Sequence, residues 1–223
     1  YDRNRLDDPE KSVPAHRKLS REEALALEPG LQSDDLTGAM LFYDYQMYSP
    51  ERLAIECLLS AVEAGADVAN YAEVVSFLRE EDRIIGVRVQ DRSPVPPRGD
   101  APPRDNYDIL GRVVVNAAGP WADLLMGRLK PAEDGSEAPP VRRLIRSKGI
   151  HLITRALTKG HAIAVPSESS HFFILPWRGH SLLGTTDTLY KGDPDGVHVT
   201  EKDIINFLAV VNKGYAGARL FRS

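Results

Sequence analysis

Residues 171–187 have the sequence HFFILPWRGHSLLGTTD and give the clearest indication of the fold. Two runs of aromatic and aliphatic residues flank a short polar segment, Arg178-Gly179-His180. Apolar runs separated by a short turn containing glycine are typical of a β-hairpin. We therefore expect a hairpin that belongs to a mainly antiparallel sheet.

The segments on either side of this hairpin predict a further strand and a helix. Upstream, KGIHLITRA, residues 148–156, is a strand candidate with alternating side chains. Downstream, Thr200 is a suitable N-cap for a helix that runs through Asn212. Apolar residues at helical spacing predict a buried face on this helix, formed by Ile204, Phe207, Leu208 and Val211.

The N-terminal half of the chain predicts two further helices. Ser20 and Glu23 have the spacing of a capping box in front of a short helix. Ser49 and Pro50 begin a longer helix that ends at Gly65. Its apolar stripe predicts a buried face, formed by Leu53, Cys57, Leu58, Ala61 and Val62.

A second hairpin and a loop are expected next. Residues 67–80 and 83–91 have the pattern of two strands separated by a charged turn. Residues 93–106 hold five prolines and predict an extended surface insertion.

The stretch VVVNAAGPW, residues 113–121, predicts a change from a buried strand to a helix. The three valines indicate a strand over residues 112–115 that is covered on both faces, as in a parallel sheet. Pro120 then begins a helix, and Ala117, Ala118 and Gly119 leave the backbone between them bare. Such a turn suits a bound phosphate, ribose or ring edge, but it equally suits a tight turn packed on a neighbouring strand.

Two further places can carry chemistry. Thr185, Thr186 and Asp187 follow Gly184, where a strand end could approach a ligand, although turns often use such side chains for their own backbone. His151 can accept a proton from a substrate hydroxyl, or it can be an ordinary hydrogen-bonded histidine.

A group of basic residues also has two interpretations. These residues can gather a phosphate or form a solvated face, and they are Arg142, Arg143, Arg146 and Lys148. The remaining histidines do not have the spacing of metal ligands, so no metal site is expected.

Composition excludes several classes of protein. The 223 residues carry a formal net charge of -4 with mixed signs, which argues against nucleic-acid binding. The single cysteine cannot form an internal disulfide. No apolar run approaches the roughly 20 residues of a membrane-spanning helix.

Several stretches, taken in order, resemble FAD-dependent glycerol-3-phosphate dehydrogenases of the D-amino-acid-oxidase-like superfamily of FAD-dependent oxidoreductases. They are YDR at the start, FYDYQMYSPERLAIECLLSAVEAGA, VVNAAGPWADLL, RSKGIHLI, FFILPW and LLGTTDTLYKGDP. The last of these is the most specific to the glycerophosphate enzymes. The resemblance implies oxidation of sn-glycerol 3-phosphate to dihydroxyacetone phosphate, with hydride transfer to FAD and electron transfer to a quinone or, in the oxidase branch, to oxygen.

The fold implied by the resemblance is α/β with α+β. In this fold, part of a Rossmann-type FAD domain is interleaved with a substrate domain that is built on a mainly antiparallel sheet. We expect three regions: a linker and the start of the substrate domain at 1–48, partial FAD-domain elements at 49–130 and the substrate domain at 141–223.

The resemblance also implies roles for individual residues. Val74, Ala117, Ala118 and Gly119 would bind FAD. His151 would be catalytic and contact the substrate, with Thr185 and Asp187 as further substrate-binding residues. The implied partners are glycerol 3-phosphate and a quinone. The full-length enzyme is expected in the cytoplasm at the inner face of the membrane, peripherally associated with it, and as a homodimer.

The chain departs from the family in two places. No G-x-G-x-x-G follows a strand, and the family's C-terminal GGKLT-like segment is missing. We therefore expect an internal piece of a longer enzyme that is inactive alone. Two alternatives stay open: a related flavin oxidase of amines or hydroxy acids, and a flavin-free binding or structural module.

Overall fold

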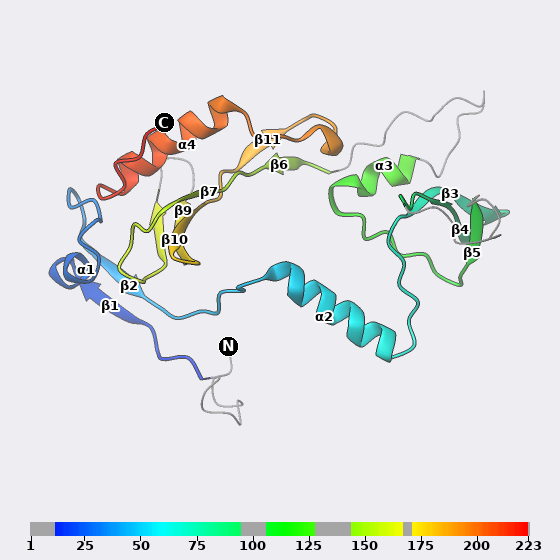
Figure 1. Ribbon diagram of the computed structural model, residues 1–223, viewed down its shortest axis with the longest axis horizontal. Coiled ribbons are helices and arrows are strands. Elements are labelled where there is room, and N and C mark those ends of the chain that lie inside the picture. Colours follow the sequence, from blue (N-terminus) through cyan, green and yellow to red (C-terminus); the bar gives the residue numbers. More distant parts are fainter. Residues whose placement is uncertain (1–11, 95–105, 128–143, 167–170, 223) are drawn as a thin grey trace. The chain divides into compact units, whose positions relative to one another are not determined.

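The chain forms two compact units that alternate along the sequence (Figure 1). A computed structural model describes residues 12–94, 106–127, 144–166 and 171–222. The first unit comprises Tyr1–Ser49, Ser147–Tyr190 and Gly196–Ser223, and the second comprises Pro50–Arg146 and Lys191–Asp195. The architecture is mixed α/β with mainly antiparallel sheets, which confirms the expected fold class. Which unit corresponds to which expected domain stays a prediction.

The first unit is built on a four-stranded antiparallel sheet in the order β7-β10-β9-β8. The expected hairpin is confirmed as β9 and β10, joined by a two-residue turn. Arg178 and Gly179 have φ values of 50° and 78°, the positive values that a type I′ turn requires. The strands are β7 (Leu152–Arg155), β8 (Ile163–Pro166), β9 (His171–Trp177) and β10 (His180–Gly184).

Helix α4 (Glu201–Gly214) packs on this sheet and closes the core. A capping box between Thr200 and Asp203 begins the helix, as the sequence predicts, and the helix ends two residues beyond the expected Asn212. Its buried face contributes Phe207 and Val211, as expected. The buried core comprises Ile150, Val165, Phe172, Ile174, Leu183, Phe207, Val211, Tyr215 and Ala218.

The N-terminal segment is attached to the same core. The expected helix is α1 (Arg21–Leu27), and its capping box is confirmed. It connects β1 (Arg17–Ser20) to β2 (Gly38–Leu41), which pair antiparallel. The buried carboxylate of Glu28 accepts hydrogen bonds from the backbone N–H of Lys159 at 3.1 and 3.3 Å. Burial and the nearby Glu28 carboxylate raise the pKa of Tyr215, whose hydroxyl donates to a backbone carbonyl.

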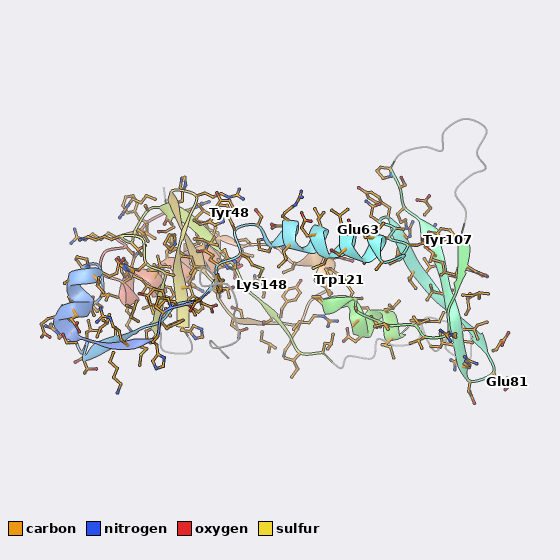
Figure 2. All side chains as sticks on the ribbon, turned by 90° about the horizontal axis from the view of Figure 1, so that it is seen from below. Tyr48, Glu63, Glu81, Tyr107, Trp121 and Lys148 are labelled. Atoms are coloured by element: carbon orange, nitrogen blue, oxygen red, sulfur yellow. The ribbon has the colours of Figure 1, made fainter. Side chains whose placement is uncertain are left out.

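The second unit holds α2 and a three-stranded antiparallel sheet in the order β3-β4-β5. The expected hairpin is confirmed, and Glu81 lies at its tip (Figure 2). The third strand follows the Pro-rich segment and is not apparent in the sequence. The elements are α2 (Pro50–Glu63), β3 (Ala72–Glu80), β4 (Arg83–Asp91), β5 (Tyr107–Leu110), the 3-10 turn η3 (Gly119–Trp121) and α3 (Ala122–Gly127).

The prediction of a strand over residues 112–115 is wrong. These residues have no regular secondary structure, and the side chains of Val113 and Val115 are 77% and 79% exposed. A buried parallel strand needs neighbours on both sides. Within the part of the chain that the structure describes, no strand pairs with this segment.

Two further expectations need correction. The strand expected over 148–156 is divided, because β6 (Arg146–Lys148) ends before a crossing segment and β7 begins only at Leu152. Helix α2 is confirmed, but none of its residues is buried. An amphipathic pattern predicts that one face of a helix packs against another element, but it does not identify that element. Among the described residues, no element buries this face.

The remaining short elements are β11 (Thr188–Tyr190), which pairs with β6, and the 3-10 turn η4 (Pro194–Gly196). Among the described residues, no helix has both the length and the apolar character needed to cross a membrane. Most of the Pro-rich insertion, together with Arg142 and Arg143, lies outside the described residues.

We predict that Ile174→Ala lowers the free energy of unfolding by about 2–5 kcal/mol, because it leaves a cavity in the closed core. Ile174 on β9 is 0% exposed, whereas Ile153 on β7 is 58% exposed and provides a matched control. Ile153→Ala should change stability by no more than about 0.5 kcal/mol. Denaturant titration of the three proteins measures both effects, and equal effects would contradict this description of the core.

Candidate functional site

His151 lies where two segments of the first unit cross. The pairing of Leu152 with Leu183 places His151 beside Gly184, the last residue of β10. A β-carbon at position 184 would lie 2.7 Å from Nε2 of His151 and 2.9 Å from its Cγ. The imidazole therefore lies directly against the bare backbone of Gly184. His151 is exposed while Ile150 is buried, as the predicted alternation requires.

The same crossing brings Thr185 and Thr186 to the start of β7. The hydroxyl of Thr186 accepts the backbone N–H of Ile150 at 3.0 Å, and the hydroxyl of Thr185 donates to the Thr186 carbonyl at 3.0 Å. Gly149 makes room for Thr185 here, because a β-carbon on Gly149 would collide with the Thr185 hydroxyl. The structure thus joins His151 and Thr185 in one crossing, and the exposed Asp187 lies two residues further on.

Of the four basic residues singled out in the sequence, the two that the structure describes, Arg146 and Lys148, form ion pairs. Arg146 pairs with the buried carboxylate of Asp123 in the second unit, and its Nε donates to the Pro120 carbonyl at 2.7 Å. In the first unit, the Nζ of Lys148 on β6 lies 2.6 Å from the Asp203 carboxylate. Figure 2 shows Lys148 at its place on the chain. Both side chains are engaged in ion pairs that support the fold. Neither of them is free to bind a phosphate, and neither belongs to a purely solvated face.

The Asp203 carboxylate is strongly stabilised in its charged form. The hydrogen bond from Lys148 and those from the Thr200 hydroxyl and backbone hold the pKa of Asp203 well below its usual range. The same carboxylate completes the capping box of α4. It therefore joins β6, next to the crossing, to the helix that covers the core.

In the second unit, Ala117, Ala118 and Gly119 lie in a turn that its own hydrogen bonds hold. Asn116 donates from Nδ2 to the Ala122 carbonyl at 2.9 Å, and its Oδ1 accepts the Ala118 N–H at 3.2 Å. The indole Nε1 of Trp121 (Figure 2) donates to Asp195 at 2.9 Å. The turn is therefore fixed without a neighbouring strand.

Gly119 in this turn faces open space. Gly119 has a φ of 51°, a conformation that favours glycine. Among the described residues, no other atom lies within 4 Å of the place where a Gly119 β-carbon would be. The exposed backbone fits the close approach of a flat ring or a ribose. Val74, the other expected FAD residue, is half-buried on β3 opposite Val89, and its contact with FAD stays a prediction.

Comparison with known proteins identifies the family. The model of the family described as "FAD dependent oxidoreductase" (DAO) matches residues 2–220 of this chain. The chain belongs to the FAD-dependent oxidoreductase family. The match extends over both units, so the turn at 117–119 and the crossing at His151 are both parts of a flavoprotein sequence.

The family relatives include glycerophosphate enzymes. The chain is 35% identical over 207 residues to a glycerol-3-phosphate dehydrogenase of Mycobacterium leprae and 30% identical over 212 residues to an alpha-glycerophosphate oxidase of Enterococcus casseliflavus. Each alignment covers 91% of this chain and 32% of the relative. The chain therefore spans about a third of the length of these curated relatives.

A solved structure from the family has a similar fold. It is the glycerol-3-phosphate dehydrogenase from Bacillus halodurans complexed with FAD, with a TM-score of 0.72 and 28% identity. The similarity covers 92% of this chain and 39% of that one.

The sequence alone does not reveal the roles of Gly149, Gly184 and Asn116. Gly184 was expected to let a ligand approach the strand end, but the structure places the His151 imidazole there. A glycine within a strand pattern does indicate close approach. It does not identify the approaching group, which lies 33 positions away in the sequence.

We predict that Asn116→Ala loosens the 117–119 turn. The variant loses the acceptor of the Ala118 N–H and the donor to the Ala122 carbonyl, at a cost of about 1 kcal/mol. Hydrogen exchange at the Ala118 amide should accelerate by about five- to tenfold. Asn212→Ala is the control, because Asn212 makes the same two kinds of bond with Leu220 in the other unit. Equal exchange at Ala118 in all three proteins would refute the role of Asn116.

A second prediction concerns pH and Asp203. Because the pKa of Asp203 is lowered in the folded chain, its charge stabilises the fold above the ordinary carboxyl pKa of about 3.9. That contribution is lost as the pH falls through the lowered pKa. Asp203→Asn should therefore lower the midpoint of thermal unfolding at pH 7, and the difference from wild type should shrink below about pH 4. The exposed turn residue Asp82 provides the control, Asp82→Asn. A pH-independent difference for Asp203→Asn would contradict the account.

Proposed function

We propose that the protein containing this chain oxidises sn-glycerol 3-phosphate to dihydroxyacetone phosphate, with FAD as the hydride acceptor. The observation that carries the proposal is the similarity of this chain, over 91% of its length, to relatives named for oxidising this substrate. The family supports the cofactor, and the relatives' names support the substrate.

The 117–119 turn is the place where this chain would hold FAD. Its backbone is exposed, its side chains are small, and the hydrogen bonds of Asn116 keep it in one conformation. When bound, FAD supplies the two-electron acceptor for the hydride from carbon 2 of the substrate. The contribution of this turn is to orient the cofactor, since it carries no acid or base.

His151 would receive the proton that leaves the substrate hydroxyl. Oxidation of a secondary alcohol to a ketone releases a hydride from carbon and a proton from oxygen. A neutral imidazole is a suitable acceptor near neutral pH, and His151 is exposed on a backbone fixed by the buried Ile150. Its ring lies against Gly184, in the space that the missing side chain leaves.

Thr185 and Asp187 would bind the polar end of the substrate that carries no phosphate. The Thr185 hydroxyl donates its hydrogen bond to the Thr186 carbonyl, but its lone pairs can still accept a hydrogen bond from the substrate. Asp187 can accept from a substrate hydroxyl, whereas its charge would repel a phosphate. The phosphate would need a partner other than Arg146 or Lys148, since both are paired with carboxylates.

Further proposals concern the whole protein. By the resemblance to FAD-dependent glycerol-3-phosphate dehydrogenases, we propose a quinone as the electron acceptor, with oxygen as the alternative because one relative is named an oxidase. By resemblance, we place the enzyme in the cytoplasm, peripherally at the inner face of the membrane, as a homodimer. Reduction of a quinone analogue in the absence of oxygen, membrane fractionation and light scattering test these three statements in turn.

We predict that the full-length protein is yellow and reduces a quinone analogue with glycerol 3-phosphate. His151→Ala should lower kcat/KM by about 100-fold through loss of the proton acceptor. His171→Ala is the matched control, because His171 is an exposed histidine of the same sheet that stacks edge-on against Phe173. Its activity should stay within about twofold of wild type.

The substrate panel should also contain glycine and a 2-hydroxy acid. A flavin-loaded protein that is reduced by these compounds and not by glycerol 3-phosphate would overturn the substrate assignment in favour of a related oxidase. A colourless protein that does not take up FAD would favour the flavin-free module.

A further inference from the structure

We infer that Gly184 is a positioning residue that sets the orientation of the His151 imidazole. The inference rests on the proposed role of His151 in substrate oxidation. Gly184 acts through the histidine and has no chemistry of its own. Its contribution is the absence of a side chain at the one place that the ring occupies.

Lack of space explains the glycine at this position. The glycines with positive φ among the described residues are Gly38, Gly65, Gly119, Gly160 and Gly179. Gly184 is not one of them, so its φ does not require glycine. The three atoms nearest to a β-carbon at position 184 all belong to the His151 ring, namely Cδ2, Nε2 and Cγ. A side chain at 184 and the ring in its present place therefore exclude each other.

The backbone beneath the ring cannot move to relieve such a clash. Ile150 is 2% exposed in the core, and its N–H is bound to the Thr186 hydroxyl. On the other segment, Leu183 is 0% exposed and pairs with Leu152. In the same manner, the Thr185 hydroxyl occupies the place where a β-carbon on Gly149 would lie. The two segments are therefore in close contact at both glycines.

The imidazole is the part that would give way. His151 is exposed, so its ring can rotate into solvent without unfolding the chain. An added methyl at 184 would thus leave the fold in place and displace the ring nitrogens by an ångström or more. Misplacement of about 1 Å is enough to cost about 100-fold in rate where a catalytic group must be aligned.

The test is a double-mutant cycle in the full-length, FAD-loaded protein with glycerol 3-phosphate. His151→Ala and Gly184→Ala should each lower kcat/KM by about 100-fold. The double variant should be within about threefold of either single variant, because the ring that Gly184 positions is gone. Independent effects would instead multiply to about 10⁴-fold.

Gly196→Ala is the matched control for adding a methyl group. Gly196 has no positive φ, and the nearest atom to a β-carbon there is the Tyr190 hydroxyl at 3.7 Å, an ordinary contact. This variant should keep wild-type activity. Flavin content and the midpoint of thermal unfolding, measured on every variant, separate ring displacement from loss of the fold.

The outcomes distinguish this inference from the proposed function. If His151→Ala is inactive but Gly184→Ala is fully active, the role of Gly184 is refuted and the proposed function stands. If His151→Ala is fully active, the proposed role of His151 fails, and a moved His151 ring signal in the NMR spectrum of Gly184→Ala would still support the geometry. If Gly184→Ala unfolds, folding restored in the double variant supports the inference, and unfolding in both backgrounds overturns it.

Discussion

The packing of α4 against the four-stranded sheet is the constraint on which the candidate site depends. It buries Ile174 and Leu183 from the sheet together with Phe207 and Val211 from the helix. Once Leu183 is fixed, its pairing with Leu152 fixes the register of β7. In the segment just before β7, Ile150 lies in the core and His151 at the surface. The position of the histidine is therefore a consequence of burial several residues away.

The second unit reaches a defined geometry by a different route. The turn at 117–119 is fixed by local hydrogen bonds from Asn116 and by the positive φ of Gly119. It does not rely on a covered strand, since Val113 and Val115 before it are exposed. The candidate site residues thus differ in what positions them: core packing and register for His151, and short-range hydrogen bonds for the turn. The match to the FAD-dependent oxidoreductase family, over residues 2–220, includes both places.

Features that depend on neighbouring residues in the sequence could be predicted, and features that depend on distant partners could not. The β9–β10 hairpin and the capped helices α1 and α4 follow from turn residues and caps within a few positions. The strand over 112–115 and the buried face of α2 required partners that the pattern does not specify. Similarly, the sequence indicates that something approaches Gly184. Only the fold shows that it is His151.

A crystal structure of the full-length protein with FAD and glycerol 3-phosphate would test the proposed site. We expect the flavin cofactor to lie against the backbone of Ala117–Gly119. We also expect a ring nitrogen of His151 to lie within hydrogen-bonding distance of the hydroxyl on carbon 2 of the substrate, with the ring packed on Gly184. A structure in which the substrate occupies another surface and His151 faces only solvent would contradict the proposed site.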